Sequence, residues 1–184
     1  MAATYPIVHS VHFYQEDSSL IERLCGVIVS GLQVGDSILV VATEAHRKVL
    51  VNELDRLEID IRAAAREHRF TMMDAAETLS AFMRDGRPDR DLFLESMGKM
   101  IADAKRWSRS KGRGLTVFGE MVAVLWEEGN RPAALELETL WNEVMTGRAF
   151  HLHCAYPKHL FSDKDVDQLG LAGVCQQHSQ VLIA

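Results

Sequence analysis

Two polar side chains that could do chemistry stand at the ends of apolar runs in this chain. Glu120 follows the run at residues 115–118, and Cys154 stands near the end of the run at residues 150–155. A carboxylate such as Glu120 can accept a hydrogen bond from a ligand, bind a metal ion or act as a base. It can also stabilise the start of the helix that follows, because negative charge is favoured at a helix N-terminus. Glu120 is therefore the first candidate for a site residue, and its role as a helix cap stays open.

His9 and Tyr14 are further candidates near the N-terminus. His9 lies inside an apolar run at residues 7–11, and Tyr14 follows in a stretch that we expect to be a loop, residues 12–18. A buried imidazole needs a hydrogen-bond partner, so His9 either pairs with another polar group of the core or faces a ligand. Tyr14 either closes over a ligand or packs against the core.

The run that holds Cys154 favours a structural role for this residue. Cys154 alternates with Phe150 and Leu152, as expected for a small, buried, apolar side chain. No sequence motif marks Cys154 as a nucleophile, and no GxSxG motif is present. We therefore expect no catalytic residues and no enzyme.

A metal site is not expected from the histidines of this run. His151 and His153 alternate with Cys154, so the three side chains cannot all face one ion. We expect no cofactor. A zinc or iron ion, if bound, would be held by His9, His12 and Glu120.

The candidate residues are expected to meet at one edge of a sheet, because ligands of open α/β sheets bind beyond the carboxyl ends of the strands. The strand ends expected along this edge are at His9, Glu44, Asp74, Glu120 and Cys154. A ligand site there would consist of His9, Tyr14, Glu120, Met121, Cys154 and Tyr156. A cavity with apolar walls and a few polar groups is the usual form of a small-molecule site.

The elements that must position these residues are helices alternating with strands. We expect strands at residues 7–11, 37–43, 70–73, 115–118, 150–155 and 180–183. Helices are expected at about residues 17–34, 44–57, 74–86, 89–110, 121–128, 132–147 and 163–171. This alternation predicts an α/β fold with a mostly parallel central sheet and helices on both faces.

The composition is that of one soluble globular domain, residues 1–184. Hydrophobic residues make up 47% of the chain and charged residues 25%. The apolar runs are shorter than the roughly 18 residues of a membrane span, and no basic segment precedes an apolar stretch at the N-terminus. We therefore expect no membrane contact. Three widely spaced cysteines favour a cytoplasmic location, and a net charge of −6 argues against nucleic acid as a partner.

Several short motifs, taken in order, resemble the MEDS domain (methanogen/methylotroph sensory domain) over about residues 9–178. The residues that carry the resemblance are His9 and Tyr14, Gly31-Leu32 with Gly35-Asp36, Phe118-Gly119-Glu120-Met121, Leu125-Trp126, Leu137-Glu138 with Trp141-Asn142, and Cys154-Ala155-Tyr156-Pro157. Val11 departs from the family, which often carries Cys between the His and the Tyr. The resemblance implies a fold related to RecA/KaiC-like proteins.

The resemblance also implies a cytoplasmic sensory domain that binds a small molecule, such as a hydrocarbon derivative. Its signal would pass to a separate signalling or regulatory protein, and the chain could form homo-oligomers. Two alternatives stay open: a protein-interaction module without a ligand, and an enzyme that uses Glu120 as a base.

Nucleotide chemistry is not expected, although the implied relatives bind ATP. A phosphate-binding loop needs the pattern GxxxxGK[ST] after the first strand. Residues 12–18 contain neither Gly nor Lys and include two acidic residues. The sequence thus predicts a RecA/KaiC-like fold without a phosphate-binding loop.

Overall fold

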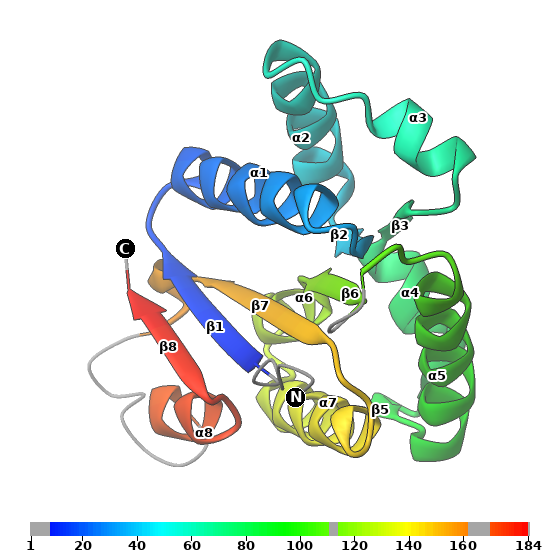
Figure 1. Cartoon of the computed structure of the whole chain (residues 1–184). Coiled ribbons are helices and arrows are strands. Elements are labelled where there is room, and N and C mark those ends of the chain that lie inside the picture. The colour runs from blue at the N-terminus through cyan, green and yellow to red at the C-terminus, as the bar shows by residue number, and fades with distance from the viewer. Residues whose placement is uncertain (1–7, 111–113, 162–169, 184) are drawn as a thin grey trace.

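A fully parallel sheet of six strands forms the centre of the molecule (Figure 1). The computed structural model describes residues 8–110, 114–161 and 170–183. The strands of the sheet are β1 (Val8–Tyr14), β2 (Ser37–Ala42), β3 (Phe70–Asp74), β6 (Leu115–Gly119), β7 (His151–Pro157) and β8 (Gln180–Ile183). They lie in the order β3-β2-β6-β7-β1-β8, and all neighbours are parallel. The predicted α/β class with a parallel sheet is confirmed.

Helices cover both faces of this sheet (Figure 1). One face is covered by α1 (Asp17–Gln33), α2 (Glu44–Arg56) and α3 (Ile61–Arg66). The other is covered by α4 (Ala75–Phe82), α5 (Arg90–Arg106), α6 (Met121–Glu127), α7 (Arg131–Met145) and α8 (Leu171–Gln176). Each face has its own cluster of buried apolar side chains. Across the described residues, no helix has both the length and the apolar character needed to cross a membrane.

Polar caps explain where several of these helices begin. The side chains of Thr43, Asp74, Asp89 and Asn130 each accept a hydrogen bond from the backbone N–H three residues later. Such a cap satisfies one of the backbone donors that a helix start leaves unpaired. The predicted start of a helix at Asp74 is confirmed.

β1 is longer than the sequence pattern predicts. We expected a loop from residue 12, but the strand continues to Tyr14 and α1 begins at Asp17. The cause is that β1 is an interior strand, which pairs with β7 on one side and β8 on the other. Polar residues such as His12 therefore lie within the sheet rather than in a loop.

Other differences concern short elements. Helix α3 and the hairpin of β4 (Met83–Arg84) with β5 (Arg87–Pro88) were not predicted. A short 3-10 helix, η1 (Lys158–Leu160), follows β7. Residues 162–169, where most of the predicted helix at 163–171 falls, lie outside the described residues, and α8 begins at Leu171.

Side chains alternate between the two faces of β1, and this decides which groups can meet. Val11 and Phe13 belong to the core beneath α6 and α7, whereas Tyr14 belongs to the core beneath α1 and α2. His9 shares the face of Val11, and His12 shares the face of Tyr14. Residues of β1 therefore belong to two separate environments.

Substitution by alanine should have opposite effects on stability at two glycines of the α1 region. Gly35 has a φ of +86°, and an added Cβ would lie 3.1 Å from the backbone nitrogen of Ser110. We expect Gly35→Ala to lower the free energy of unfolding by about 1–2 kcal/mol, since a left-handed backbone strains any residue with a Cβ.

Gly26, in α1, is the matched control because an added Cβ would have no atom within 4 Å. Gly26→Ala should leave stability unchanged or raise it by up to about 1 kcal/mol, because alanine favours the helix. Urea unfolding of both variants measures the difference, and equal effects would contradict this description of the α1–β2 turn.

Candidate functional site

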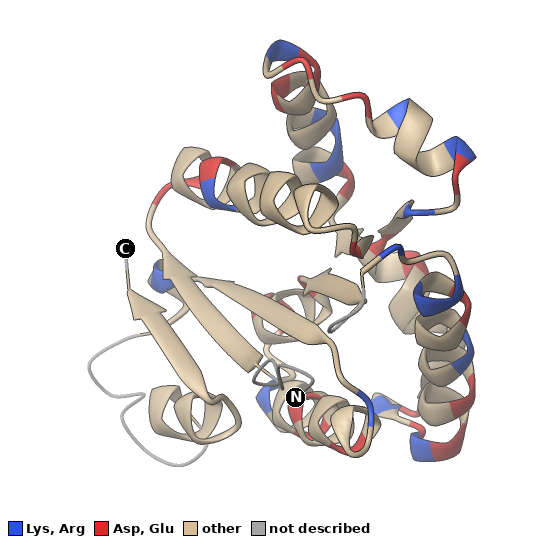
Figure 2. Cartoon of the chain, in the orientation of Figure 1, with Lys and Arg blue, Asp and Glu red and all other residues tan. Residues whose placement is uncertain are grey.

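Buried charges mark the places where this fold departs from an ordinary core. Charged side chains lie mainly on the helices, and β1, β7 and β8 carry no Lys, Arg, Asp or Glu (Figure 2). Among the residues that the structure describes, three acidic ones are nevertheless buried, namely Asp36, Glu120 and Glu138. A buried charge is costly without a partner, so Glu120 and Glu138 need compensating groups around them.

Glu138 lies at the centre of a group of polar side chains beneath α7. We call this group the core polar cluster; it consists of His9, Glu138, Cys154, Tyr156 and His178. The Glu138 side chain is completely buried, and so are the side chains around it. The cluster joins β1, β7, α7 and the turn after α8.

The carboxylate of Glu138 is close to all four other members. Its Oε1 accepts a hydrogen bond of 2.9 Å from the Tyr156 hydroxyl. Its Oε2 lies 3.3 Å from Nε2 of His9 and 3.4 Å from Nε2 of His178. The Cys154 thiol lies 3.6 Å from the same oxygen and 3.5 Å from Nε2 of His9.

Electrostatics keep Glu138 ionised despite its burial. Burial opposes ionisation, but His178 and His9 hold the pKa of the Glu138 carboxyl well below its usual range. Burial and the Glu138 charge raise the pKa values of Cys154 and Tyr156 well above normal, so both keep their protons. Burial opposes protonation of His178, yet the Glu138 charge leaves its pKa raised.

Glu120 has a different role, at the carboxyl edge of the sheet. It occupies the position before α6, but its side chain makes no capping hydrogen bond. Instead Oε2 accepts a 2.8 Å hydrogen bond from the Thr43 N–H, and Oε1 lies 2.5 Å from Nδ1 of His46. Glu120 therefore ties the end of β6 to the start of α2.

The His46–Glu120 pair is partly closed off by α1. Nε2 of His46 lies 3.5 Å from Asp17 in the first turn of α1. The hydrogen bond with Glu120 raises the pKa of His46, against the opposing effect of burial. Tyr14 packs edge-on against His46. Burial, together with the charge of Glu120, raises the pKa of the Tyr14 hydroxyl. We call this group the edge cluster: Tyr14, Asp17, His46 and Glu120.

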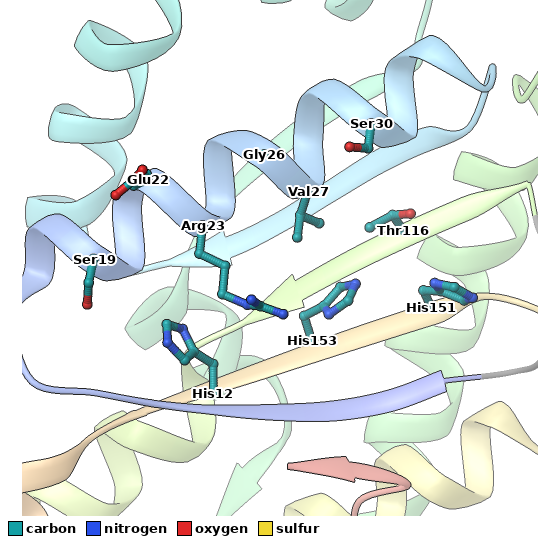
Figure 3. A pocket seen from close by; sticks show the side chains of 10 residues that line it. All are labelled: His12, Ser19, Glu22, Arg23, Gly26, Val27, Ser30, Thr116, His151 and His153. Carbon is teal, nitrogen blue, oxygen red and sulfur yellow. The ribbon is translucent and has the colours of Figure 1, made fainter. Parts of the chain in front are cut away.

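A cavity of about 600 Å³ lies between α1 and the sheet (Figure 3). We call it the α1 pocket. Its polar lining includes His12, Arg23, Thr116, His151 and His153. Parallel strands buried by helices normally carry apolar side chains on both faces, so polar groups on three central strands, β1, β6 and β7, are a departure from that pattern.

His12 has an unsatisfied polar atom in this pocket. The side chain is 7% exposed, and its Nδ1 has no hydrogen-bond partner among the described residues. Burial, with the charges of Arg23 and Lys158, lowers the pKa of His12 to about 4. The imidazole is therefore neutral at pH 7. Gly26, an exposed residue of α1 that also lines the pocket, has open space where a side chain would stand.

The six predicted ligand residues do not converge on one cavity. His9, Cys154 and Tyr156 belong to the core polar cluster, and Tyr14 and Glu120 belong to the edge cluster. Met121 is 1% exposed and packs in the apolar core. The separation follows from the alternation along β1, which directs His9 and Tyr14 to opposite faces.

The predicted edge is correct in part. Glu44, Asp74 and Glu120 do stand at the carboxyl ends of β2, β3 and β6. His9 and Cys154 do not, because His9 is near the amino end of β1 and Cys154 is in the middle of β7. The prediction for these two residues was wrong, since both strands run further than their apolar patterns suggest.

The expected metal set is also corrected. His9 and His12 lie on opposite faces of β1, so they cannot join Glu120 around one ion. The inference that His153 and Cys154 point apart is confirmed: Nδ1 of His153 lies 2.6 Å from Ser10, and Cys154 contacts His9. The partners missed from the sequence are His46, Glu138 and His178. Glu138 alone had a visible signal, as a charge within the inward apolar stripe of α7.

The edge cluster predicts a specific dependence of stability on pH. Because the pKa of His46 is raised in the folded state, its pairing stabilises fully below the ordinary His pKa of about 6.5. This stabilisation is lost as the pH rises through the raised pKa. At pH 6, His46→Gln should cost about 1.5–3 kcal/mol, and this difference from wild type should shrink toward pH 9.

Urea unfolding from pH 5.5 to pH 9 measures this difference. His159→Gln, on the exposed side of η1, is the control and should show no such trend. A His46→Gln variant whose deficit grows with pH would contradict the assignment.

Comparison with known proteins points to one family. A sequence model described as "MEDS: MEthanogen/methylotroph, DcmR Sensory domain" matches residues 8–171. Neither curated proteins nor solved structures gave a match. The matched region begins with β1 and ends at the first residue of α8, so it includes His9, Glu138 and Cys154 but not His178.

Proposed function

Because the chain belongs to the MEDS family of sensory domains, we propose that it binds a small molecule in the α1 pocket and reports this to a separate partner protein. The observation that carries the proposal is Nδ1 of His12, which has no partner in the described part of the chain and is buried at a cavity of about 600 Å³. Small-molecule sites usually have volumes of about 300–1,000 Å³ and a few well-placed polar groups.

The lining indicates the chemical class of the ligand. Arg23 offers a cationic donor, and neutral His12 offers a ring nitrogen that can donate or accept according to its tautomer. Val27 and Gly26 are the two residues of the lining without a polar side chain, and they give the pocket an apolar part. A short hydrocarbon that carries a carboxylate or a hydroxyl group matches this lining. We also propose that the chain is related to RecA/KaiC-like proteins and acts in the cytoplasm, as its resemblance to MEDS domains implies.

Helix α1 connects the α1 pocket with the edge cluster. Gly26 and Arg23 of α1 border the pocket, and Asp17 at the start of the same helix lies 3.5 Å from His46 of the edge cluster. A ligand that moves α1 would thus alter the His46–Glu120 pair. Enzymatic use of Glu120 as a base is disfavoured, because both of its oxygens already have partners.

Native mass spectrometry of the purified protein, beside its denatured mass, is the first test. A retained small molecule would then be identified and titrated by calorimetry. Without one, the probes are straight-chain carboxylates and alcohols of two to six carbons, screened by thermal shift.

The substitution Gly26→Leu should weaken binding of the ligand in the α1 pocket. The leucine side chain extends into the open space beside Gly26 and should weaken binding at least tenfold, while leucine favours the helix. Gly26→Ala is the matched control and should bind within about threefold of wild type, since a single methyl group leaves most of the cavity free.

Circular dichroism would establish that both variants fold. Equal affinity of the folded Gly26→Leu variant, or no binding of any probe by wild type, would contradict a ligand in this pocket. The second result would favour a ligand-free interaction module.

A further inference from the structure

We propose that the core polar cluster is a zinc-binding site, with His9, Glu138, Cys154 and His178 as the four ligands. One donor atom from each of these residues lies within 4.8 Å of the other three. The site is on the opposite face of the sheet from the α1 pocket, and it stands independently of the proposed sensory function.

Four of the six separations between the proposed ligand atoms are those of a tetrahedron around zinc, and all six are within 4.8 Å. Bonds of about 2.0–2.2 Å to nitrogen and oxygen, and about 2.3 Å to sulfur, place tetrahedral ligand atoms about 3.3–3.6 Å apart. The observed separations from Oε2 of Glu138 are 3.3 Å to His9, 3.4 Å to His178 and 3.6 Å to Cys154. A fourth separation, from Cys154 Sγ to His9 Nε2, is 3.5 Å.

Both histidines are oriented as zinc ligands by hydrogen bonds on their other nitrogen. Nδ1 of His9 lies 2.9 Å from Oδ1 of Asn142, and Nδ1 of His178 lies 2.7 Å from the carbonyl oxygen of Val174. Carbonyl oxygens only accept, so each Nδ1 is the donor. In the neutral ring, Nε2 then presents its lone pair toward Glu138, which is the arrangement of metal-ligating histidines.

Asn142 and Tyr156 complete the outer layer of the site. The Asn142 side-chain nitrogen donates to the carbonyl oxygen of Gln177, which fixes the oxygen of the same amide toward His9. Tyr156 donates to the oxygen of Glu138 that does not face the histidines. The ligands are thus held in place by groups that do not themselves touch the ion.

One nitrogen of this cluster is left unsatisfied by the protein groups that the structure describes. Nε2 of His178 is buried and has no hydrogen-bond partner among them, although it lies 3.4 Å from a carboxylate oxygen. If both rings are neutral, their Nε2 lone pairs face the carboxylate and repel it unless a cation lies between them. A zinc dication would accept all of these lone pairs.

Charge balance also fits zinc. On binding, the Cys154 thiol loses its proton to solvent. The dication, the thiolate and the Glu138 carboxylate then sum to zero net charge, which suits a completely buried site. Thiolate, imidazole and carboxylate ligands in a tetrahedron are typical of zinc, and four protein ligands are typical of structural sites.

The test is metal content and affinity of the full chain. Protein stripped with a chelator, reloaded with excess zinc and desalted should hold one zinc per chain by elemental analysis. Asn142→Ala removes only the support of His9 and should weaken zinc binding about 10–100-fold in a competition with a chromophoric chelator.

Cobalt substitution reports the thiolate directly. Wild type loaded with Co²⁺ should show cobalt–thiolate charge transfer and the intense visible bands of tetrahedral cobalt. Cys154→Ser should lose the charge-transfer band. Cys25→Ser should keep it, because Cys25 is an equally buried cysteine in the core of the other face.

Either of two results would overturn the proposal. One is a folded wild type that retains no zinc after loading, which would leave the cluster as an ion pair of Glu138 with imidazolium rings. The other is a wild-type cobalt spectrum without thiolate charge transfer, a result that does not depend on how any variant folds.

Discussion

The completely buried carboxylate of Glu138 is the constraint on which the core of this protein depends. An ionised carboxylate removed from water loses several kcal/mol of solvation, and the protein must supply groups that compensate for it. Tyr156 of β7 donates a hydrogen bond to Glu138, and His9 of β1 and His178 after α8 place their Nε2 atoms beside it. Removing one partner of such a buried pair costs about 3–5 kcal/mol. Glu138 thus couples the central strands to the C-terminal edge of the sheet.

The sheet separates this rigid centre from the face where we locate sensing. On the α1 side, polar side chains of the central strands border a cavity, and Nδ1 of His12 has no hydrogen-bond partner among the described residues. On the α7 side, the polar groups are packed against each other and against aromatic rings such as Tyr156 and Trp126. A ligand bound in the α1 pocket, as proposed, would lie on the other side of the sheet from the core polar cluster.

Much of the fold follows from the sequence because apolar runs and helix caps are local signals. The run at β2 and the cap at Asp74 needed no tertiary information. The end of β1 did, since its polar residues lie in the sheet only because two neighbouring strands supply hydrogen bonds. The core polar cluster was beyond prediction for a similar reason. Its members stand far apart in the sequence, and His178 is brought to Glu138 only by the path of α8 and β8.

The most direct test of this account is the protonation state of the two histidines that face Glu138. Nitrogen NMR of histidine-labelled, zinc-loaded protein at pH 7 reports each ring nitrogen, and single histidine variants assign the signals. With zinc bound, His9 and His178 are expected to carry a proton on Nδ1 and none on Nε2, whose lone pair binds the metal. Protons on both nitrogens of both rings would contradict it, because Glu138 would then be compensated by imidazolium charge alone.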